Sequence, residues 1–250
     1  MKTHHLEQTL RSLRLSGMLD TLEARLAQAQ AGELGHIEFL QTLCEDELQR
    51  RDASGITRRV RAARFEQMCS IEDFDFSFNP KIPAARIRDL ATLRFVESGE
   101  SVVLHGPVGV GKTMVAQALG HQACRRGYTV VFTKTSRLLS DLAGGHADRT
   151  WGARLRRWSA PSVLVLDDFA MRAFTPTQSD DLYELVTERA GKSLIATANR
   201  AATDWYSLFP NAVVAESILD RVVNSAHHIH MEGKSYRPNT RPGQTESEKK

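Results

Sequence analysis

The chain has 250 residues, of which 41% are hydrophobic and 25% are charged, so it has the composition of a folded protein and not of a disordered one. The formal net charge of +3 is small, so any nucleic-acid function must depend on where the basic residues lie. The three cysteines form no CxxC pair, which argues against a disulfide framework and against a zinc site. No apolar run approaches the roughly 18 residues of a membrane span and no signal core is present, so we expect a cytoplasmic protein without membrane contacts.

Residues 1–68 are predicted to form a small all-helical N-terminal domain. Leucines recur there at the spacing of one helix face, as at Leu6, Leu10 and Leu13. Arginines gather in its second half, and two interpretations stay open: a solvated helix face, or a surface for DNA, an acidic partner or another subunit. Residues 69–83 contain three phenylalanines and two prolines that break the helical period, and we interpret them as a linker.

From residue 84 onward, helices alternate with short apolar strands. The predicted strands are Ser101–His105, Tyr128–Thr133, Ser162–Leu166 and Ser193–Ala198. Near-continuous apolar strands separated by helices are typical of a parallel sheet that is covered on both faces. The sequence therefore predicts a three-layer α/β domain over residues 84–235, followed by a disordered tail at residues 236–250.

The strongest chemical signal follows the first of these strands. The residues that fit the pattern GxxxxGK[ST] are Gly106, Pro107, Val108, Gly109, Val110, Gly111, Lys112 and Thr113. In this motif the glycines let main-chain N–H groups surround phosphates at the start of a helix. Lys112 would place its charge on the β and γ phosphates, and the Thr113 hydroxyl would reach Mg²⁺. The loop therefore predicts a P-loop NTPase that uses ATP and Mg²⁺.

Two adjacent carboxylates, Asp167 and Asp168, end the third predicted strand. A nucleotide-bound Mg²⁺ needs a carboxylate from a neighbouring strand end, so Asp167 is assigned with Thr113 to the metal. Asp168 is assigned to the attacking water, as the group that orients it and accepts its proton. The alternative for Asp168 is a structural role as the cap of the following turn.

Two further polar residues are candidates for the hydrolysis step. Asn199 follows the fourth predicted strand, and its amide can hydrogen-bond both the γ phosphate and the attacking water. Arg221 lies in a later predicted helix, where it could act as an arginine finger delivered to a neighbouring subunit. The alternative for Arg221 is a surface salt bridge.

A polar insertion between the second and third predicted strands carries a series of basic residues. They are Lys134, Arg137, Arg149, Arg154, Arg156 and Arg157. We interpret them as contacts to the phosphates of double-stranded DNA, and since the sequence offers few groups for reading bases, we expect binding that is largely independent of DNA sequence.

Together these motifs resemble the IstB helper ATPases of bacterial insertion sequences. The resemblance rests on GPVGVGKT, LVLDDF, TANR, AESILDR and the closing SYRP, and extends to LRLSGMLDTLEARL and DFDFSFNPKIP. It implies an AAA+ ATPase of the initiator and helicase-loader branch, similar to the DnaC loader. It also implies a homo-oligomeric ring or spiral that assembles on target DNA and recruits the transposase IstA.

Two other functions remain open on the residues alone. A DnaC-like helicase loader would share every residue of the ATP site and differ only in what its N-terminal helices bind. An ATP-gated scaffold would bind ATP and DNA without turnover. An ABC-type ATPase is not favoured, because the segment between the phosphate loop and Leu142-Ala143-Gly144-Gly145-His146 is too short for a helical subdomain.

Overall fold

The computed structural model describes residues 2–236 and divides the chain into two compact units, Met1–Arg58 and Arg59–Lys250. The boundary lies before residue 68, the predicted end of the helical domain, because the residues from Arg59 onward pack with the second unit. Arg59 Nε donates a hydrogen bond to Cys124 O at 2.8 Å, and Ala63 is buried in the core of the second unit. The predicted tail lies outside the described residues except for Tyr236.

The first unit consists of α1 (Lys2–Ser12), α2 (Ser16–Gln30) and the larger part of α3 (His36–Ala63). Its core is small and contains Leu10, Leu22 and Leu43. Gly17 allows α2 to approach α3 closely, since a Cβ at this position would lie 2.6 Å from Glu47 Cα. Burial alone raises the pKa of Glu47, but hydrogen bonds from Arg51 and from the Gly17 and Met18 N–H groups outweigh burial and hold the pKa below its usual value.

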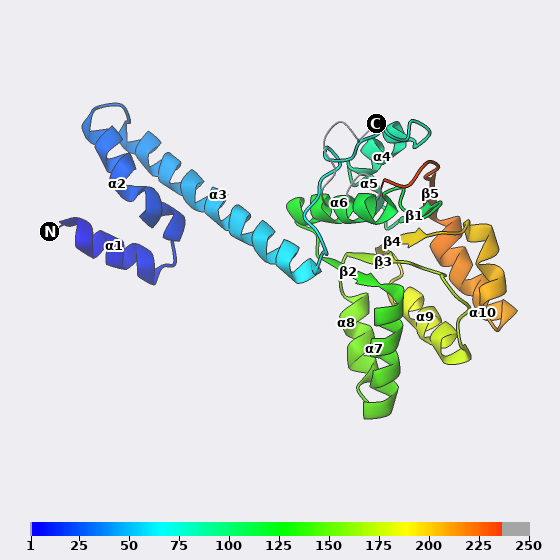
Figure 1. Ribbon diagram of the computed structural model, residues 1–250. Coiled ribbons are helices and arrows are strands. Elements are labelled where there is room, and N and C mark those ends of the chain that lie inside the picture. The colour runs from blue at the N-terminus through cyan, green and yellow to red at the C-terminus, as the bar shows by residue number, and fades with distance from the viewer. Residues whose placement is uncertain (1, 237–250) are drawn as a thin grey trace, which may run out of the picture. The chain divides into compact units, whose positions relative to one another are not determined.

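The second unit is built around a five-stranded sheet in the order β2-β3-β4-β1-β5, and all its paired strands are parallel (Figure 1). The strands are β1 (Ser101–His105), β2 (Val130–Lys134), β3 (Val163–Asp167), β4 (Ser193–Ala198) and β5 (Ala226–His230). The predicted α/β fold with a parallel sheet is therefore confirmed, and β1 and β4 have the predicted bounds. The prediction missed β5, because this edge strand is rich in histidine and pairs only with β1.

Alternate residues of the central strands face opposite sides of the sheet, which creates two separate apolar layers. Val163 and Val165 of β3 belong to one core cluster, and Leu164 and Leu166 belong to the other. The first cluster contains α4 (Ala84–Leu90), α5 (Arg94–Glu97) and α6 (Lys112–Arg125). The second contains α7 (Thr135–Asp148), α8 (Trp151–Ser159), α9 (Pro176–Glu188) and α10 (Ala212–Leu219). The sheet thus lies between two helical layers, as Figure 1 shows for α6 on one side and α7 to α9 on the other.

The sequence pattern predicts one amphipathic helix from Ala84 to Glu97 and one short helix from Arg137 to Leu142, and the structure differs from both predictions. The helix expected from Ala84 to Glu97 is interrupted at Leu93, whose φ of 67° is left-handed and ends the helical run. The insertion between β2 and β3 is not one short helix but the pair α7 and α8. A π-helical segment, η3 (Asp220–Asn224), follows α10, and two short 3₁₀ turns precede it, η1 (Ala202–Asp204) and η2 (Tyr206–Leu208). In residues 2–236, no helix combines the length and apolar character needed to cross a bilayer.

A buried arginine ties the end of α8 to the start of β4. The Arg189 side chain is 3% exposed, and its Nη atoms donate to four main-chain oxygens, those of Trp158, Ser159, Pro161 and Ser193. Burial lowers the pKa of Arg189 to about 10, so the guanidinium keeps its charge at neutral pH. Three of these carbonyl groups lie at the end of α8 and in its connection to β3, and the fourth lies at the start of β4. Arg189 therefore joins the second helical layer to the sheet.

We expect Arg189→Met to lower the free energy of unfolding by about 2–4 kcal/mol, because it leaves several buried carbonyl oxygens without donors. Urea unfolding followed by tryptophan fluorescence measures this loss in the second unit alone, since the three tryptophans are Trp151, Trp158 and Trp205. The exposed Arg126→Met is the control and should change the free energy by less than about 0.5 kcal/mol. Equal unfolding midpoints for the two variants would contradict the role given to Arg189.

Candidate nucleotide site

The candidate site lies where three parallel strands end side by side. Because β4 lies between β1 and β3 in the sheet, their carboxyl ends bring together the loop after β1, the last residue of β3 and the residue after β4. A cavity of about 440 Å³ opens at this edge of the sheet. The residues that line it are Gln67, Val108, Gly109, Gly111, Lys112, Thr113, Met114, Asp168, Asn199 and Tyr236. Residues of the phosphate loop, Asp168 and Asn199 are thus brought together at one site.

Asp167 connects the elements of the site. Its carboxylate is 3% exposed, and Oδ1 accepts hydrogen bonds from Thr113 Oγ1 at 2.8 Å and from Thr197 Oγ1 at 2.6 Å. Its main-chain oxygen accepts from Thr135 Oγ1 at 3.0 Å. Two hydroxyl donors compensate a charge that would be costly to bury alone. The pairing of Asp167 with Thr113 is the one expected for two groups that share a metal.

Lys112 is held within the phosphate loop. Its Nζ donates to Gly106 O at 2.8 Å and to Pro107 O at 2.7 Å, and the side chain is 7% exposed. Gly111, immediately before α6, has a φ of 96°, so the loop reaches the helix through a left-handed residue. The lysine charge therefore lies inside the loop, at the N-terminus of α6.

Asp168 and Asn199 differ from Asp167 in being accessible. Asp168 is exposed, has a left-handed φ of 55°, and its N–H donates to Thr197 Oγ1 at 3.1 Å. Asn199 Nδ2 donates to Met171 Sδ at 3.1 Å. The backbone of Asp168 thus turns its side chain away from that of Asp167, so the two adjacent carboxylates occupy different environments: one is buried among hydroxyl groups and the other lines the cavity.

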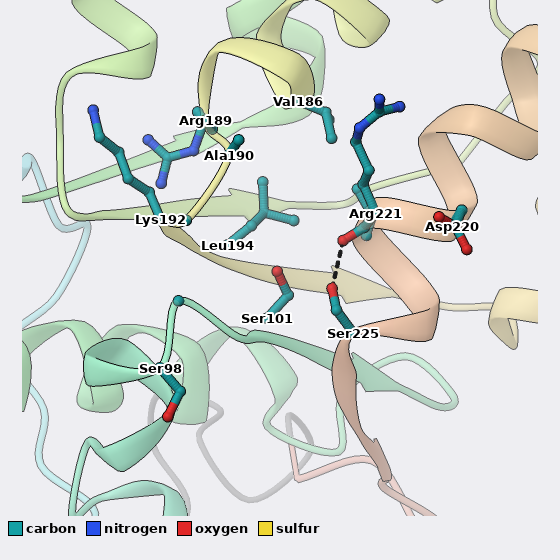
Figure 2. A pocket seen from close by; sticks show the side chains of 13 residues that line it. Ser98, Ser101, Val186, Arg189, Ala190, Lys192, Leu194, Asp220, Arg221 and Ser225 are labelled. Carbon is teal, nitrogen blue, oxygen red and sulfur yellow. Dashed lines mark hydrogen bonds between the residues drawn. The ribbon is translucent and has the colours of Figure 1, made fainter.

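Arg221 does not line this cavity. It belongs to η3, which leads into the start of β5, whereas the phosphate loop follows the end of β1. Arg221 lines a different pocket of about 460 Å³ together with Asp220, Lys192 and Ser225, as Figure 2 shows. Its Nη1 donates to Ser217 O and Oγ, at 3.0 and 2.6 Å. The structure therefore does not bring Arg221 to the nucleotide cavity of its own chain.

The sequence analysis missed some residues that shape the site. Thr197 donates to Asp167 and accepts from the Asp168 N–H, so one hydroxyl orients both aspartates. The signal for Thr197 is a polar residue that follows the apolar run Leu194-Ile195-Ala196 of β4. Gln67 and Tyr236 also line the cavity. No motif marks Gln67, and Tyr236 belongs to the closing SYRP, which contributes to the resemblance but is given no role in the site.

The basic residues of the insertion fall into two groups. Arg154 and Arg157 pair with Asp141, at 3.2 and 2.6 Å, and Arg154 also donates to the main-chain oxygen of Asp141 at 2.7 Å, so these arginines hold α7 against α8. Arg137, Arg149 and Arg156 have exposed side chains. Only part of the predicted basic surface is therefore available without breaking contacts within the hairpin of α7 and α8.

Comparison with known proteins finds a family and relatives that are named for ATP binding. The family profile described as IstB-like ATP binding protein matches residues 8–243. A Mycobacterium tuberculosis protein, named as an ATP-binding protein in an insertion sequence, is 63% identical over 244 residues that cover 97% of each chain.

Solved structures of replication proteins share the fold. The DnaC helicase loader aligns with a TM-score of 0.55 and 21% identity, over 70% of this chain and 99% of that one. AMPPCP-bound DnaA from Aquifex aeolicus aligns with a TM-score of 0.56 and 15% identity, over 69% of this chain and 53% of that one. At these identities the likeness defines the fold alone. The chain therefore belongs to the IstB-like ATP-binding proteins and has the AAA+ fold.

Proposed function

We propose that the protein is an ATP-hydrolysing AAA+ helper that assembles on double-stranded DNA and recruits the transposase of its insertion sequence, which the family resemblance names as IstA. The observation that carries the ATPase part is that Thr113 and Asp168 line one cavity, and that Thr113 donates a hydrogen bond to the buried Asp167. The transposition part rests on the family and on the relative named for an insertion sequence.

The residues present fit a nucleotide and its metal. A Cβ at Gly111 would lie 2.5 Å from Phe74 Cε2, and one at Gly109 would lie 2.0 Å from Ser235 Oγ, so the loop keeps its shape only with glycine. A threonine hydroxyl and a carboxylate form an oxygen donor set that suits Mg²⁺. When bound, Mg²⁺ would neutralise charge on the β and γ phosphates, and Thr113 and Asp167 are the residues that would hold it.

In the proposed reaction Lys112 binds the phosphates, and Asp168 orients a water molecule and accepts its proton. The water oxygen bonds to the γ phosphorus as the bond to the bridging oxygen of ADP breaks. Asn199, on the neighbouring strand end, hydrogen-bonds the γ phosphate and the water. The exposure of Asp168 supports this role, because the buried carboxylate of Asp167 is already engaged by two hydroxyls.

Arg221 completes the proposal as a residue that acts in a neighbouring subunit. It lies at the amino ends of the strands, whereas the cavity lies at their carboxyl ends. In a homo-oligomer, contact between the amino ends of the strands in one subunit and the carboxyl ends in the next would place Arg221 at the γ phosphate of that next subunit. A ring or a spiral is the assembly with such repeated contacts.

A second candidate function is a DnaC-like helicase loader. The observation that favours it is the fold alignment that covers almost the whole DnaC chain. Both functions use the same ATP chemistry, so they differ only in the protein partner and in the DNA complex that forms.

We expect Gly111→Ala to weaken ATP binding at least tenfold, because the new methyl group displaces Phe74 or the loop. Gly127→Ala is the matched control: both glycines have a φ of 96°, but a Cβ at Gly127 meets nothing within 4 Å. Both variants carry the same strain of a left-handed alanine, of roughly 1–2 kcal/mol. Calorimetric titration with ATP should therefore separate them, and equal ATP affinities would refute the requirement for glycine in the loop.

Asp168→Asn should keep ATP affinity within about twofold and reduce phosphate release by roughly 100-fold or more, because the amide keeps the shape but accepts no proton. The measurement compares ATP titration with a phosphate-release assay in the presence of DNA. Asp180→Asn, at an exposed position of α9, is the control and should keep full turnover. Loss of ATP binding in Asp168→Asn would instead make Asp168 a metal ligand or a structural residue.

Assembly and partner choice are tested together by electron microscopy of the protein with ATP and duplex DNA, with the transposase or a hexameric helicase added. A multimer on duplex DNA that retains the transposase supports the helper function, and a complex formed only with a hexameric helicase supports the loader.

For the subunit contact, Arg221→Ala and Lys112→Ala should each be inactive, and their mixture should regain ATPase activity from composite sites. Wild-type turnover by Arg221→Ala alone would refute the contribution of Arg221 to a neighbouring site.

A further inference from the structure

The cavity is also lined by residues that the proposed ATPase chemistry does not use. They are Gln67, Met114 and Tyr236, which offer a carboxamide, a thioether side chain and a phenol ring. Lys112, Thr113, Asp168 and Asn199 have the roles proposed for the phosphates and the attacking water. The remaining walls therefore combine the flat ring of Tyr236 with two groups that can both donate and accept hydrogen bonds, the Gln67 carboxamide and the Tyr236 hydroxyl.

Gln67 is fixed by the same helix that begins at the phosphate loop. Gln117 Oε1 accepts from the N–H groups of Glu66 and Gln67, at 2.8 and 3.2 Å, and His121 Nε2 donates to Gln67 O at 3.1 Å. Gln117 and His121 are 1% and 2% exposed, and they lie one and two helical turns after Thr113 on α6. The main chain of Gln67 is thus held firmly, while its exposed side chain lines the cavity.

Tyr236 is fixed independently, from the other end of the chain. Its N–H donates to Gly109 O in the phosphate loop at 2.9 Å, and its ring meets Phe78 edge-on, with centroids 4.9 Å apart. Two residues earlier, the Lys234 main chain exchanges two hydrogen bonds of 2.9 Å with the Asn79 side chain. These contacts hold the Tyr236 ring at the cavity wall although the side chain is partly exposed.

We propose that Gln67 and Tyr236 form the nucleobase end of the site and select adenine, an assignment that rests on the proposed binding of ATP. The Tyr236 ring stacks on the base, and the Gln67 carboxamide pairs with the adenine edge, which presents one donor and one acceptor, N6 and N7. Guanine presents two acceptors on the same edge, so it would leave the Gln67 oxygen without a donor. The selectivity comes from Gln67 and the general affinity for a base comes from Tyr236.

The test compares the dissociation constants of ATP, GTP and inorganic tripolyphosphate, which lacks a base, by calorimetry with the full-length protein and Mg²⁺. Tyr236→Ala should weaken ATP binding roughly 5-fold to 100-fold, the range of base stacking on an aromatic ring, and leave tripolyphosphate binding unchanged. Tyr236→Phe should retain ATP affinity within about twofold. Gln67→Leu should bring the ATP and GTP affinities together, and Tyr206→Ala, an exposed tyrosine outside the cavity, should change none of them.

The outcomes separate this assignment from the proposed function. A wild-type protein that binds neither ATP nor tripolyphosphate would overturn both. A wild-type protein that binds ATP, with a Tyr236→Ala variant that weakens ATP and tripolyphosphate equally, would overturn the stacking role alone, because Tyr236 would then act through Gly109 and the phosphate loop. An unchanged ratio of ATP to GTP affinity in Gln67→Leu would overturn the selection of adenine by Gln67.

Discussion

The buried carboxylate of Asp167 is the constraint on which the architecture of the second unit depends. Its Oδ1 must receive hydrogen bonds from Thr113 at the start of α6 and from Thr197 in β4, or the charge would be too costly to bury. Both donors are in reach only because β4 pairs with β1 and with β3, so that the loop after β1 and the end of β3 share one edge. The strand order, the two helical layers and the position of the phosphate loop are therefore parts of a single arrangement.

The parts of the fold that follow from local sequence were predictable. The glycine spacing of the loop specifies a turn around phosphate, and the apolar runs of β1 and β4 specify buried strands with the bounds that the structure has. Other parts depend on contacts between distant segments. Gln67 is positioned by Gln117, and Tyr236 by Gly109, pairs that no local period connects. The missed strand β5 carries three histidines at the sheet edge, where half-exposed positions need no apolar run.

The hairpin of α7 and α8 shows why the number of basic residues in a segment does not give the number that are available to contact DNA. Asp141 accepts hydrogen bonds from Arg154, Arg157 and the Trp158 indole, and it joins the two helices. Burial alone raises the pKa of Asp141, but the bonds from Trp158 and Arg157 outweigh burial and hold the pKa below its usual value. These arginines stabilise the hairpin, so the proposed DNA contact depends on the exposed Arg137, Arg149 and Arg156.

The positions of the nucleotide cavity and of Arg221 limit the symmetry of any active assembly. The nucleotide cavity lies at the carboxyl ends of the strands, and Arg221 lies where η3 leads into the amino end of β5. A two-fold symmetric contact uses the same patch on both subunits, so it would need Arg221 and the cavity on one face. Since Arg221 lies at the amino ends of the strands and the cavity lies at their carboxyl ends, the proposed contact must be head to tail. In an open head-to-tail assembly, the first and the last subunit each keep one contact surface without a neighbour. The assembly therefore either closes into a ring or continues as a spiral. DNA, whose repeating phosphates offer equivalent contacts to successive subunits, is a template that suits either form.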